Sequence, residues 1–404
     1  MAFVFPFRAL RPRPDRAAAV AAVPYDVVSA DEARQLAAGN PLSFLHVSRP
    51  EIGLPPDTDP YAEAVYDEAK RNFERLKADA PLVFEPEPAL YLYRLRMGDH
   101  VQSGVAGAYS VDEYDADVIL KHEKTRKDKE DDRTRHIVAL RAQTGPVFLT
   151  YRAVPEIGAV GDRVAAGAAL FDFTADDGVR HTIWKMGPAE ATQMEALFAA
   201  VPRLYIADGH HRAASASRAR RQLAGGAAPG EAGRFLAVAF AHDQMQVLPY
   251  NRTVKDLNGR TPGELLEALG RSHRVAPGPA TPARRGEVSM FLAGHWHTVT
   301  LGPPAAGASA ASSLDVSLLH DQILSPLLGI GDVRVDKRID FLGGARGPAA
   351  LERAVGSGAA AVAFSMYPVD VADLMAISDR GEIMPPKSTW FEPKLRDGLL
   401  SHVI

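Results

Sequence analysis

Apolar and polar positions follow helical and strand periods in turn along the whole chain. A helix is expected at residues 29–38, where Ser29 and Glu32 make a capping box and Gly39 follows the last turn. At residues 60–78 apolar side chains recur every three to four positions and mark one helix face. By the same criteria, further helices are expected at residues 162–170, 189–201, 261–270, 314–327, 348–355 and 369–376.

Short apolar runs between turn residues predict strands, and several of these runs are spaced as hairpins. Hairpins mixed with helices indicate an α+β fold with mixed sheets and packed helices, not a regular parallel alternation. The expected hairpins join residues 89–95 to 101–110, 169–174 to 179–184, 235–241 to 245–254 and 288–292 to 296–301. Single strands are expected at 43–47, 146–152, 204–207, 338–342 and 360–365, and an irregular tail at 384–394.

The length of the chain, 404 residues, suggests two to three domains at about 150 residues each. The expected division lies near residue 150. Residues 1–150 would form an N-terminal α+β region with a charged segment. Residues 151–404 would form a second α+β region with a phosphate-binding motif and a C-terminal flap.

Composition narrows the class of protein. The 46 basic and 50 acidic residues give a net charge of −4, so no overall field attracts nucleic acid, and no basic recognition helix is visible. A hydrophobic content of 46% is ordinary for a globular protein, and no run of about 18 apolar residues predicts a membrane span. The absence of cysteine excludes disulfides and thiolate chemistry. A cytoplasmic protein is therefore expected.

The clearest candidate chemistry lies at residues 205–212. An apolar strand ends in Asp208 and Gly209, and a helix running to about Leu223 follows at once. The free N–H groups of a helix's first turn, at the positive end of its dipole, form a site for anions and above all for phosphate. The side chains that add donors at this point are His210, His211 and Arg212.

Asp208 beside a phosphate implies a cation between them, and Mg²⁺ held against phosphate oxygens resolves the conflict. In the alternative interpretation, Asp208 only caps the helix and the two histidines lie on its surface. Zinc fits less well, because His210 and His211 are adjacent and adjacent side chains point to different faces of a helix. The residues therefore favour a phosphate site with a magnesium ligand.

A second cluster of charge covers residues 121–136, with seven basic and five acidic side chains, and leads into a helix that ends near Gln143. Charge runs are usually solvated faces, and that alternative stays open. The other interpretation is a pocket for an anionic substrate, in which Glu123 is a base or a metal ligand. The groups expected on the anion are Lys121, His122 and Arg126, with Arg133 as a further cation.

Two smaller features add candidate residues. Asp26 lies at a turn before the first helix, where it is either a base or part of a structural turn. Near the end of the chain, Trp390 and Phe391 need burial, so this tail is expected to pack on the body as a flap over a site. Its candidate ligand residues are Lys387, Ser388 and Thr389.

Several motifs together resemble a bacterial and archaeal family known as domain of unknown function 1015. The resemblance spans nearly the whole chain, and one departure is Ala213, where the family pattern has tyrosine. The motifs are residues 7–12 (FRALRP), 24–27 (PYDV), 122–125 (HEKT), 208–212 (DGHHR) and 386–394 (PKSTWFEPK).

Residues 208–212 also resemble the nucleotide-binding signature of the ParB/sulfiredoxin superfamily, whose members place a glycine and basic residues at a helix N-terminus under phosphates. One branch with the same five-residue signature phosphorylates free L-serine. The resemblance implies a ParB/sulfiredoxin-like nucleotide-binding core and a phosphotransferase acting on a small hydroxylated metabolite, with L-serine as the leading candidate. Sulfiredoxin chemistry is excluded, because it needs a cysteine.

The functional hypothesis is a small-molecule kinase that requires Mg²⁺ and uses ATP, ADP or pyrophosphate. In this hypothesis Asp208 and Glu123 hold the metal, Asp26 or Glu123 accepts the proton of the attacking hydroxyl, and His211 is catalytic. The residues that hold the donor phosphates are Gly209, His210, His211 and Arg212.

Two alternatives come from other classes: a nucleotide-sensing binding protein of the ParB-like superfamily without kinase activity, and a metabolite hydrolase that uses no nucleotide. The expected partners are a small-molecule substrate and a nucleotide or pyrophosphate, with no nucleic acid and no membrane. The oligomeric state stays open, with a homodimer as one candidate.

Overall fold

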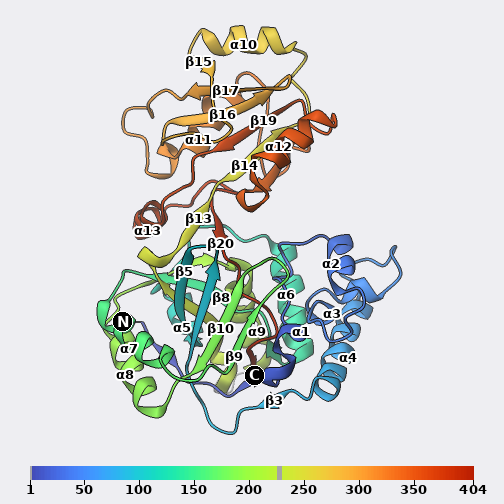
Figure 1. Ribbon diagram of the computed structural model, residues 1–404, viewed down its shortest axis with the longest axis vertical. Helices are drawn as coiled ribbons and strands as arrows, with labels where there is room; N and C mark the ends of the chain where they lie inside the picture. Colours follow the sequence, from blue (N-terminus) through green and yellow to red (C-terminus); the bar gives the residue numbers. More distant parts are fainter. Residues whose placement is uncertain (1, 225–229) are drawn as a thin grey trace. The chain divides into compact units, whose positions relative to one another are not determined.

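The computed structural model describes residues 2–224 and 230–404 of the chain (Figure 1). Contacts divide the chain into a first unit, Met1–Met245 with Pro393–Ile404, and a second unit, Gln246–Glu392. The expected boundary near residue 150 falls inside strand β8 (Val147–Tyr151) of the first unit, which pairs with a strand on each side. A hydrogen-bonded sheet continues through that position, so the contacts place the division later in the chain.

A nine-stranded mixed sheet forms the centre of the first unit. Its order is β6-β11-β8-β12-β5-β4-β10-β9, and β1 pairs with β5 off this path. β6 is parallel to β11 and β8 is parallel to β12, whereas the other neighbours are antiparallel. Besides β8, the strands are β1 (Val4–Phe5), β4 (Tyr91–Met97), β5 (His100–Ser110), β6 (Ile119–Leu120), β9 (Phe171–Thr174), β10 (Arg180–Lys185), β11 (Leu204–Asp208) and β12 (Arg234–Ala241).

The middle of this sheet is buried on both faces. Every residue of β8 is buried, and so is every residue of β12 after the first. Continuous apolar runs of this kind are typical of strands covered on both sides. Gly104 in β5 lies directly against β12, where an added Cβ atom would be 2.8 Å from side-chain atoms of Phe240 and Val238. This glycine therefore permits the close packing of the two strands.

Helices pack on this sheet and on one another (Figure 1). α9 packs against β8, β12 and α6, and α7 packs against α8, β4 and β10. The helices of the first unit are α1 (Ala17–Val20), α2 (Ala30–Ala37), α3 (Leu45–Ser48), α4 (Glu63–Asp79), α5 (Val111–Asp115), α6 (Lys127–Leu140), α7 (Pro155–Ala165), α8 (Pro188–Ala199) and α9 (His210–Ala224).

A small sheet of order β3-β2-β21-β7 joins the beginning and the end of the chain. β21 pairs with β2 on one side and with β7 on the other. Asp397 also exchanges backbone hydrogen bonds with Ala22. These pairings hold the last twelve residues on the first unit, where they reach the candidate site. The strands are β2 (Ala9–Arg11), β3 (Val83–Phe84), β7 (Ala142–Gln143) and β21 (Ser401–Val403).

The second unit is built on an antiparallel six-stranded sheet of order β15-β17-β16-β19-β14-β18, and β13 pairs separately with β20. Its strands are β13 (Gln246–Leu248), β14 (Tyr250–Val254), β15 (Arg274–Pro277), β16 (Glu287–Leu292), β17 (His295–Thr300), β18 (Ile339–Gly343), β19 (Val362–Met366) and β20 (Trp390–Glu392). Its helices are α10 (Pro262–Gly270), α11 (Asp315–Leu319), α12 (Gly347–Gly356) and α13 (Val371–Asp379).

The expected α+β class with mixed sheets and packed helices is confirmed. The predicted capping box at Ser29 is present, and a second one forms at Thr261. Three predicted hairpins are also present, namely β4 with β5, β9 with β10, and β16 with β17. The residues that predict these elements are close neighbours in the sequence.

Some predicted elements are wrong where a distant partner decides the structure. Residues 43–47, expected as a strand, overlap the mostly buried helical turn α3, because a short apolar run suits either state. Residues 235–241 and 245–254 do not pair as a hairpin. Instead β12 pairs with β5 and β8, while β13 and β14 belong to the second unit.

Other corrections concern the ends of elements. The helix expected at 162–170 is α7, which begins with Pro155 at its first turn. The helix expected at 314–327 consists of α11 and a π-helical turn at His320–Leu324. The tail at 384–394 is not wholly irregular, since it contains β20. Much of the charged segment 121–136 is itself helical, as the beginning of α6.

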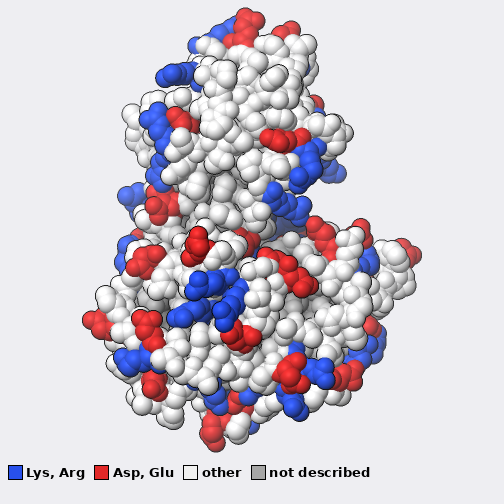
Figure 2. Space-filling view, in the orientation of Figure 1, with Lys and Arg blue, Asp and Glu red and all other residues white. Residues whose placement is uncertain are grey.

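Acidic and basic side chains are interspersed over the face of the molecule in Figure 2, in line with the small net charge. One group of basic side chains gathers over the first unit on this face. In the described part of the chain, none of the helices combines the length and the apolar character that a membrane span requires.

Candidate functional site

The predicted strand, glycine and helix at residues 204–212 are present as β11, Gly209 and α9. Gly209 has a φ of +93°, a conformation that residues with a side chain rarely adopt. An added Cβ atom there would also lie 2.8 Å from Nε of Arg212. The chain therefore turns sharply at a residue without a side chain, and the first amides of α9 lie at that turn.

Asp208 ends β11 and lies between two cations. Its Oδ2 accepts a hydrogen bond from Nζ of Lys394 at 2.9 Å, and its Oδ1 lies 3.7 Å from Nη2 of Arg212. Burial alone would raise the pKa of Asp208, but Lys394 and Arg212 hold it well below the usual value. The carboxylate is therefore ionised, and its charge is already balanced by the protein.

Arg212 is almost fully buried, with 9% of its side chain exposed. Its Nη1 donates to the carbonyl oxygen of Pro146, and its Nη2 lies 4.0 Å from Oδ2 of Asp26. Burial would lower the pKa of this guanidinium, but Asp26, Asp208 and other nearby acids raise it further above its already high value. The site therefore contains a permanent positive charge in the first turn of α9.

Asp397 lines the same cavity as Arg212 and is 2% exposed. Burial raises its pKa to about 7, although Arg212 opposes this shift. Among the described residues, its Oδ1 has no hydrogen-bond partner. A cavity of about 40 Å³ adjoins this carboxyl, and its polar lining residues include Tyr25, Arg133, His136, Thr144 and Arg212.

The loop at residues 121–126 is held against α9 by two imidazoles. The backbone N–H of His122 donates to Nε2 of His210 at 3.4 Å, and that of Arg126 donates to Nε2 of His211 at 3.0 Å. Burial lowers the pKa of both His210 and His211. The rings are therefore neutral at neutral pH, and because Nε2 accepts, the proton of each ring is on Nδ1.

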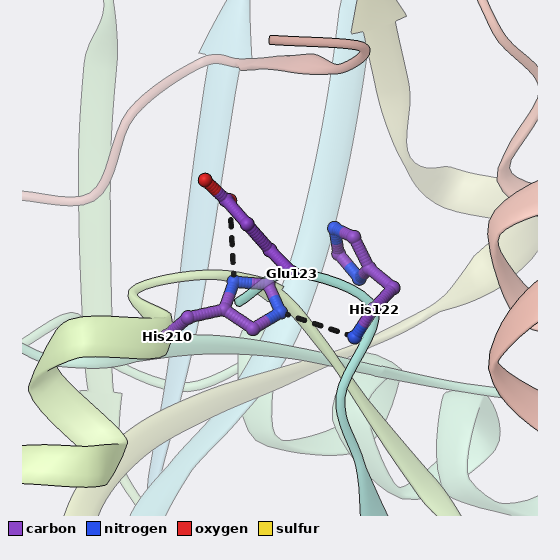
Figure 3. A group of neighbouring side chains, drawn as sticks. All are labelled: His122, Glu123 and His210. Atoms are coloured by element: carbon purple, nitrogen blue, oxygen red, sulfur yellow. Dashed lines mark hydrogen bonds and ion pairs between the residues drawn. The ribbon is translucent and has the colours of Figure 1, made fainter. Parts of the chain in front are cut away.

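Glu123 and His122 of this loop lie beside His210 (Figure 3). Oε2 of Glu123 is 3.7 Å from Nδ1 of His210, and 44% of the glutamate side chain is exposed. The ring of His122 meets the ring of His210 edge to face, with centroids 4.3 Å apart. Burial lowers the pKa of His122 to about 4, so this ring is neutral as well.

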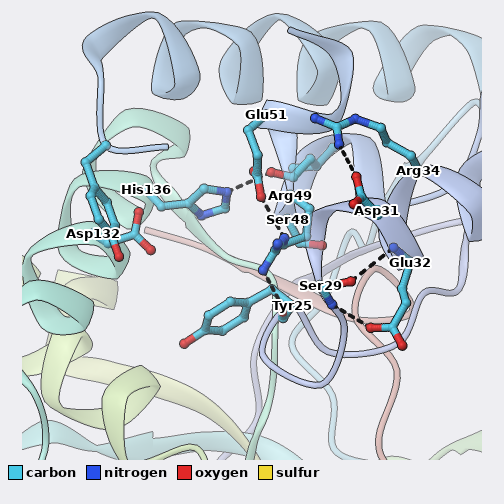
Figure 4. A network of polar contacts seen from close by, with 12 residues as sticks. Tyr25, Ser29, Asp31, Glu32, Arg34, Ser48, Arg49, Glu51, Asp132 and His136 are labelled. Carbon is cyan, nitrogen blue, oxygen red and sulfur yellow. Dashed lines mark hydrogen bonds and ion pairs between the residues drawn. The ribbon is translucent and has the colours of Figure 1, made fainter. Parts of the chain in front are cut away.

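Asp26 is placed at the same site by the turn at residues 24–27, in which the Val27 N–H donates to the Pro24 carbonyl. Arg49 donates to the carbonyl oxygen of Tyr25 at 3.0 Å (Figure 4). The Tyr25 ring lies 4.2 Å from the guanidinium of Arg133. These contacts hold the 35%-exposed Asp26 side chain near Arg212.

The predicted cations of the charged segment form local pairs. Lys121 bonds Asp117 at 2.7 Å, and Arg126 bonds Asp128 at 2.8 Å. Arg133 is mostly buried and bonds Asp132 at 2.8 Å. For Lys121 and Arg126 the interpretation as a solvated face and the interpretation as an anion pocket both remain, since an anion would have to replace these partners.

The predicted tail ligands belong to the second unit. Nζ of Lys387 lies 5.3 Å from the ring centre of Tyr250, and the Lys387 carbonyl oxygen accepts from Arg252 at 3.0 Å. Ser388 donates to the carbonyl oxygen of Pro385 at 2.5 Å. The role expected for Lys387, Ser388 and Thr389 stays a prediction.

Two residues of the site were missed from the sequence, Lys394 and Asp397. Lys394 closes the motif at 386–394, so the motif contained a signal, but nothing local connects it to Asp208, which lies 186 residues earlier. Asp397 stands outside every motif singled out. Its position depends on the backbone pairing with Ala22.

Comparison with known families supports the resemblance noted from the motifs. The sequence matches the family described as Protein of unknown function (DUF1015) over residues 4–317. The chain belongs to this family. A comparison with curated proteins found no match.

Solved structures similar to this DUF1015 protein share little sequence with it. A free serine kinase mutant in complex with ADP is 16% identical, over 74% of this chain and 92% of that chain, with a TM-score of 0.37. SbnI with a C-terminal truncation, from Staphylococcus aureus, is 13% identical over 74% and 87%, with a TM-score of 0.39. A conserved hypothetical protein from Pyrococcus furiosus is 14% identical over 74% and 95%, with a TM-score of 0.35. At these values the likeness carries no argument about activity.

Proposed function

We propose that the protein is a phosphotransferase that moves a phosphoryl group from ATP, ADP or pyrophosphate to a small hydroxylated metabolite, with free L-serine as the first candidate. The observation that carries the proposal is the gathering of a buried guanidinium and two partly exposed carboxylates around the first amides of α9. Phosphoryl transfer depends mainly on positioning and charge neutralisation. The five-residue signature at 208–212, with its resemblance to a serine-phosphorylating branch, supports the same reaction class.

We assign the donor phosphates to the first turn of α9. The N–H groups of this turn have no partner within the helix, and they lie at the positive end of its dipole. The guanidinium of Arg212 is held in place by Pro146 and by acids, so little ordering is needed when an anion binds. His211 accepts the Arg126 N–H through Nε2, which leaves its Nδ1–H as a donor.

The proton of the acceptor hydroxyl goes to Asp26 or Glu123 in this proposal. A general base must be accessible to the substrate, and these two side chains are 35% and 44% exposed. Asp397 is buried and Asp208 is bonded to Lys394, so neither is available. The substitutions Asp26→Asn and Glu123→Gln, made separately, distinguish the two. The base variant loses kcat while its KM for the donor changes little.

Mg²⁺ is proposed to accompany the donor phosphates and to neutralise part of their charge. This ion takes oxygen ligands, and in such sites one or two carboxylates hold it together with phosphate oxygens and water. Glu123 fits this role, because it is partly exposed beside α9. Asp208, the other predicted ligand, fits less well, because Lys394 and Arg212 already lie at its two oxygens.

The test is the formation of O-phosphoserine from L-serine and Mg²⁺ with ATP, ADP or pyrophosphate in turn, followed by mass spectrometry. L-Alanine is the matched acceptor control, because it lacks only the hydroxyl group. Phosphorylated product with serine and none with alanine supports the proposal. Tight nucleotide binding without product from any hydroxylated metabolite identifies a nucleotide sensor instead.

His211→Ala is expected to lower kcat about 10²–10³-fold, the usual cost of removing one well-placed donor. The protein should stay folded, which circular dichroism checks. His211→Gln is the matched variant, because its amide can still accept the Arg126 N–H and donate to an anion. It should recover part of the rate. Full activity in His211→Ala would contradict the placement of the site.

A further inference from the structure

We infer that His122, Glu123 and His210 form a binding site for a divalent transition-metal ion of the Zn²⁺ type. The residues come from two segments, the loop at 121–126 and the first turn of α9 (Figure 3). Each offers one ligand atom, and these atoms all lie within 4.8 Å of one another. The inference concerns the ion alone and does not depend on the phosphotransferase activity.

His122 provides an observation beyond proximity. Its side chain is 3% exposed, and among the described residues its Nδ1 has no hydrogen-bond partner. The hydrogen bond of this ring to the Ile206 backbone therefore involves Nε2. A histidine that donates one N–H to a carbonyl presents the lone pair of its other nitrogen, which is the usual arrangement of metal-bound histidines. A buried nitrogen without a partner is unfavourable, and a metal ion would satisfy it.

The other two ligands are close to the required geometry. Nδ1 of His210 lies 3.7 Å from Oε2 of Glu123. In a tetrahedral site with metal–ligand bonds of about 2.0–2.2 Å, ligand atoms are about 3.3 Å apart. Glu123 and His210 thus need only a small approach, whereas the three ligand atoms are bounded only at 4.8 Å from one another, so the widest pair would have to close further. Two nitrogens and one oxygen would leave a fourth position for water or a ligand.

Metal binding requires a change of tautomer at His210. Its Nε2 now accepts the His122 N–H at 3.4 Å, so its proton is on Nδ1. An ion at Nδ1 places the proton on Nε2, and this hydrogen bond is lost. The distance is long for such a bond, so the loss is small. The 3.0 Å bond from Arg126 to His211 still holds the loop.

The donor set distinguishes this ion from Mg²⁺, and an ion of this type would occupy the Glu123 carboxylate, which would leave Asp26 as the base of the proposed reaction. Imidazole nitrogens suit zinc, cobalt and similar metals, whereas Mg²⁺ takes oxygen ligands. The sequence disfavoured zinc because His210 and His211 are adjacent. The structure pairs His210 with His122 of another segment instead, and that objection does not apply to this pair.

The test is titration of the metal-free full-length protein with Co²⁺, followed by its visible absorption and by competition with Zn²⁺. The wild type should show the intense bands of four- or five-coordinate cobalt, which Zn²⁺ removes, and Zn²⁺ should raise its Tm. Glu123→Gln, at a partly exposed position, and His122→Asn should each weaken binding by more than about tenfold. The control is His295→Asn, at an exposed position of β17, and it should bind Co²⁺ as the wild type does.

The inference is overturned if Co²⁺ does not bind, if it shows only the weak bands of a six-coordinate ion, or if Glu123→Gln and His122→Asn bind as tightly as the wild type. Circular dichroism of both variants separates loss of ligands from loss of fold. No nucleotide or acceptor is present in the titration. Failure of the phosphotransferase assay therefore leaves this result unchanged, and absence of metal binding leaves the assay unchanged.

Discussion

The first turns of α9 and α10 differ in how their free backbone N–H groups are capped. At α10, the Oγ1 of Thr261 accepts from the Glu264 N–H at 3.3 Å, and the Glu264 carboxylate accepts from the Thr261 N–H at 2.7 Å. At α9, the preceding residue is Gly209, which has no side chain to accept a hydrogen bond. The start of α10 is capped by its own residues, whereas the first N–H groups of α9 need other partners.

The charged groups near the two helix starts also differ in their burial and in the distance along the chain to their partners. The charged group in the first turn of α10, Glu264, is exposed and accepts a hydrogen bond from Thr261, three residues before it. At α9, Arg212 and Lys394 are nearly buried, and Lys394 is 186 residues from its partner Asp208. Fixed buried charges are costly to assemble and are typical of functional sites. The contrast supports the proposal that ligands bind at the start of α9, whereas the start of α10 has a structural role.

The comparison predicts its largest effect at Arg212. Arg212→Met should abolish activity and lower the free energy of unfolding by about 3–5 kcal/mol, because Asp26 and Asp208 lose a buried counter-charge. The control Arg271→Met, at the C-terminal end of α10, breaks a pair whose side chains are 74% and 69% exposed and should leave the Tm unchanged. Thermal unfolding and activity of both variants test this. Equal stability of the two variants would show that Arg212 is not a needed counter-charge for Asp26 and Asp208.

Local signals predicted the two helix starts correctly. The capping residues of α10 lie within four positions of one another, and the strand, glycine and helix at α9 are consecutive. The fold class and most hairpins rest on similar short patterns. A sequence pattern is sufficient wherever the interacting residues are near neighbours.

The other strand pairings and the side-chain contacts of the site depend on residues far apart in the chain, which no short sequence pattern contains. The pairing of β12 with β5, and the contact of Lys394 with Asp208, join segments far apart in the chain. The same holds for the metal cluster, in which His122 and His210 are 88 residues apart. The sequence identified the motifs of the site, but the choice of partner for each side chain came from packing of the whole first unit.

Asp397 and Glu264 are expected to give opposite pH dependences of the free energy of unfolding. Burial raises the pKa of Asp397 to about 7, from 3.8 in an unfolded chain, whereas hydrogen bonds from Thr261 lower the pKa of Glu264. An acid with a raised pKa stabilises the fold at low pH, and this contribution is lost as the pH rises through about 7. The contribution of Glu264 has the opposite sign and is lost as the pH falls below about 4.5.

Asp397→Asn should therefore gain stability relative to the wild type as the pH rises from about 4 to about 7, and the difference should then level off. The difference between the two proteins is the quantity to measure, because buried histidines such as His122 and His136 give a pH dependence of the opposite sign in both. Glu264→Gln should differ from the wild type by a constant amount between about pH 5 and about pH 7. A constant difference for Asp397→Asn as well would show that its carboxyl is ionised throughout.

The smallest effects are expected from one methyl group at each helix start. Gly209→Ala places a side chain at a φ of +93° and against Arg212, so it should cost about 1–3 kcal/mol of stability and lower activity. Gly263→Ala in the first turn of α10 has open space around its new methyl group and should gain up to about 1 kcal/mol with activity unchanged. Urea unfolding measures both. Gly209 precedes α9, whereas Gly263 is the second residue of α10. A loss at Gly209 is expected if the α9 turn needs its backbone conformation and its closeness to Arg212. A gain at both positions would mean that α9 starts as an ordinary helix.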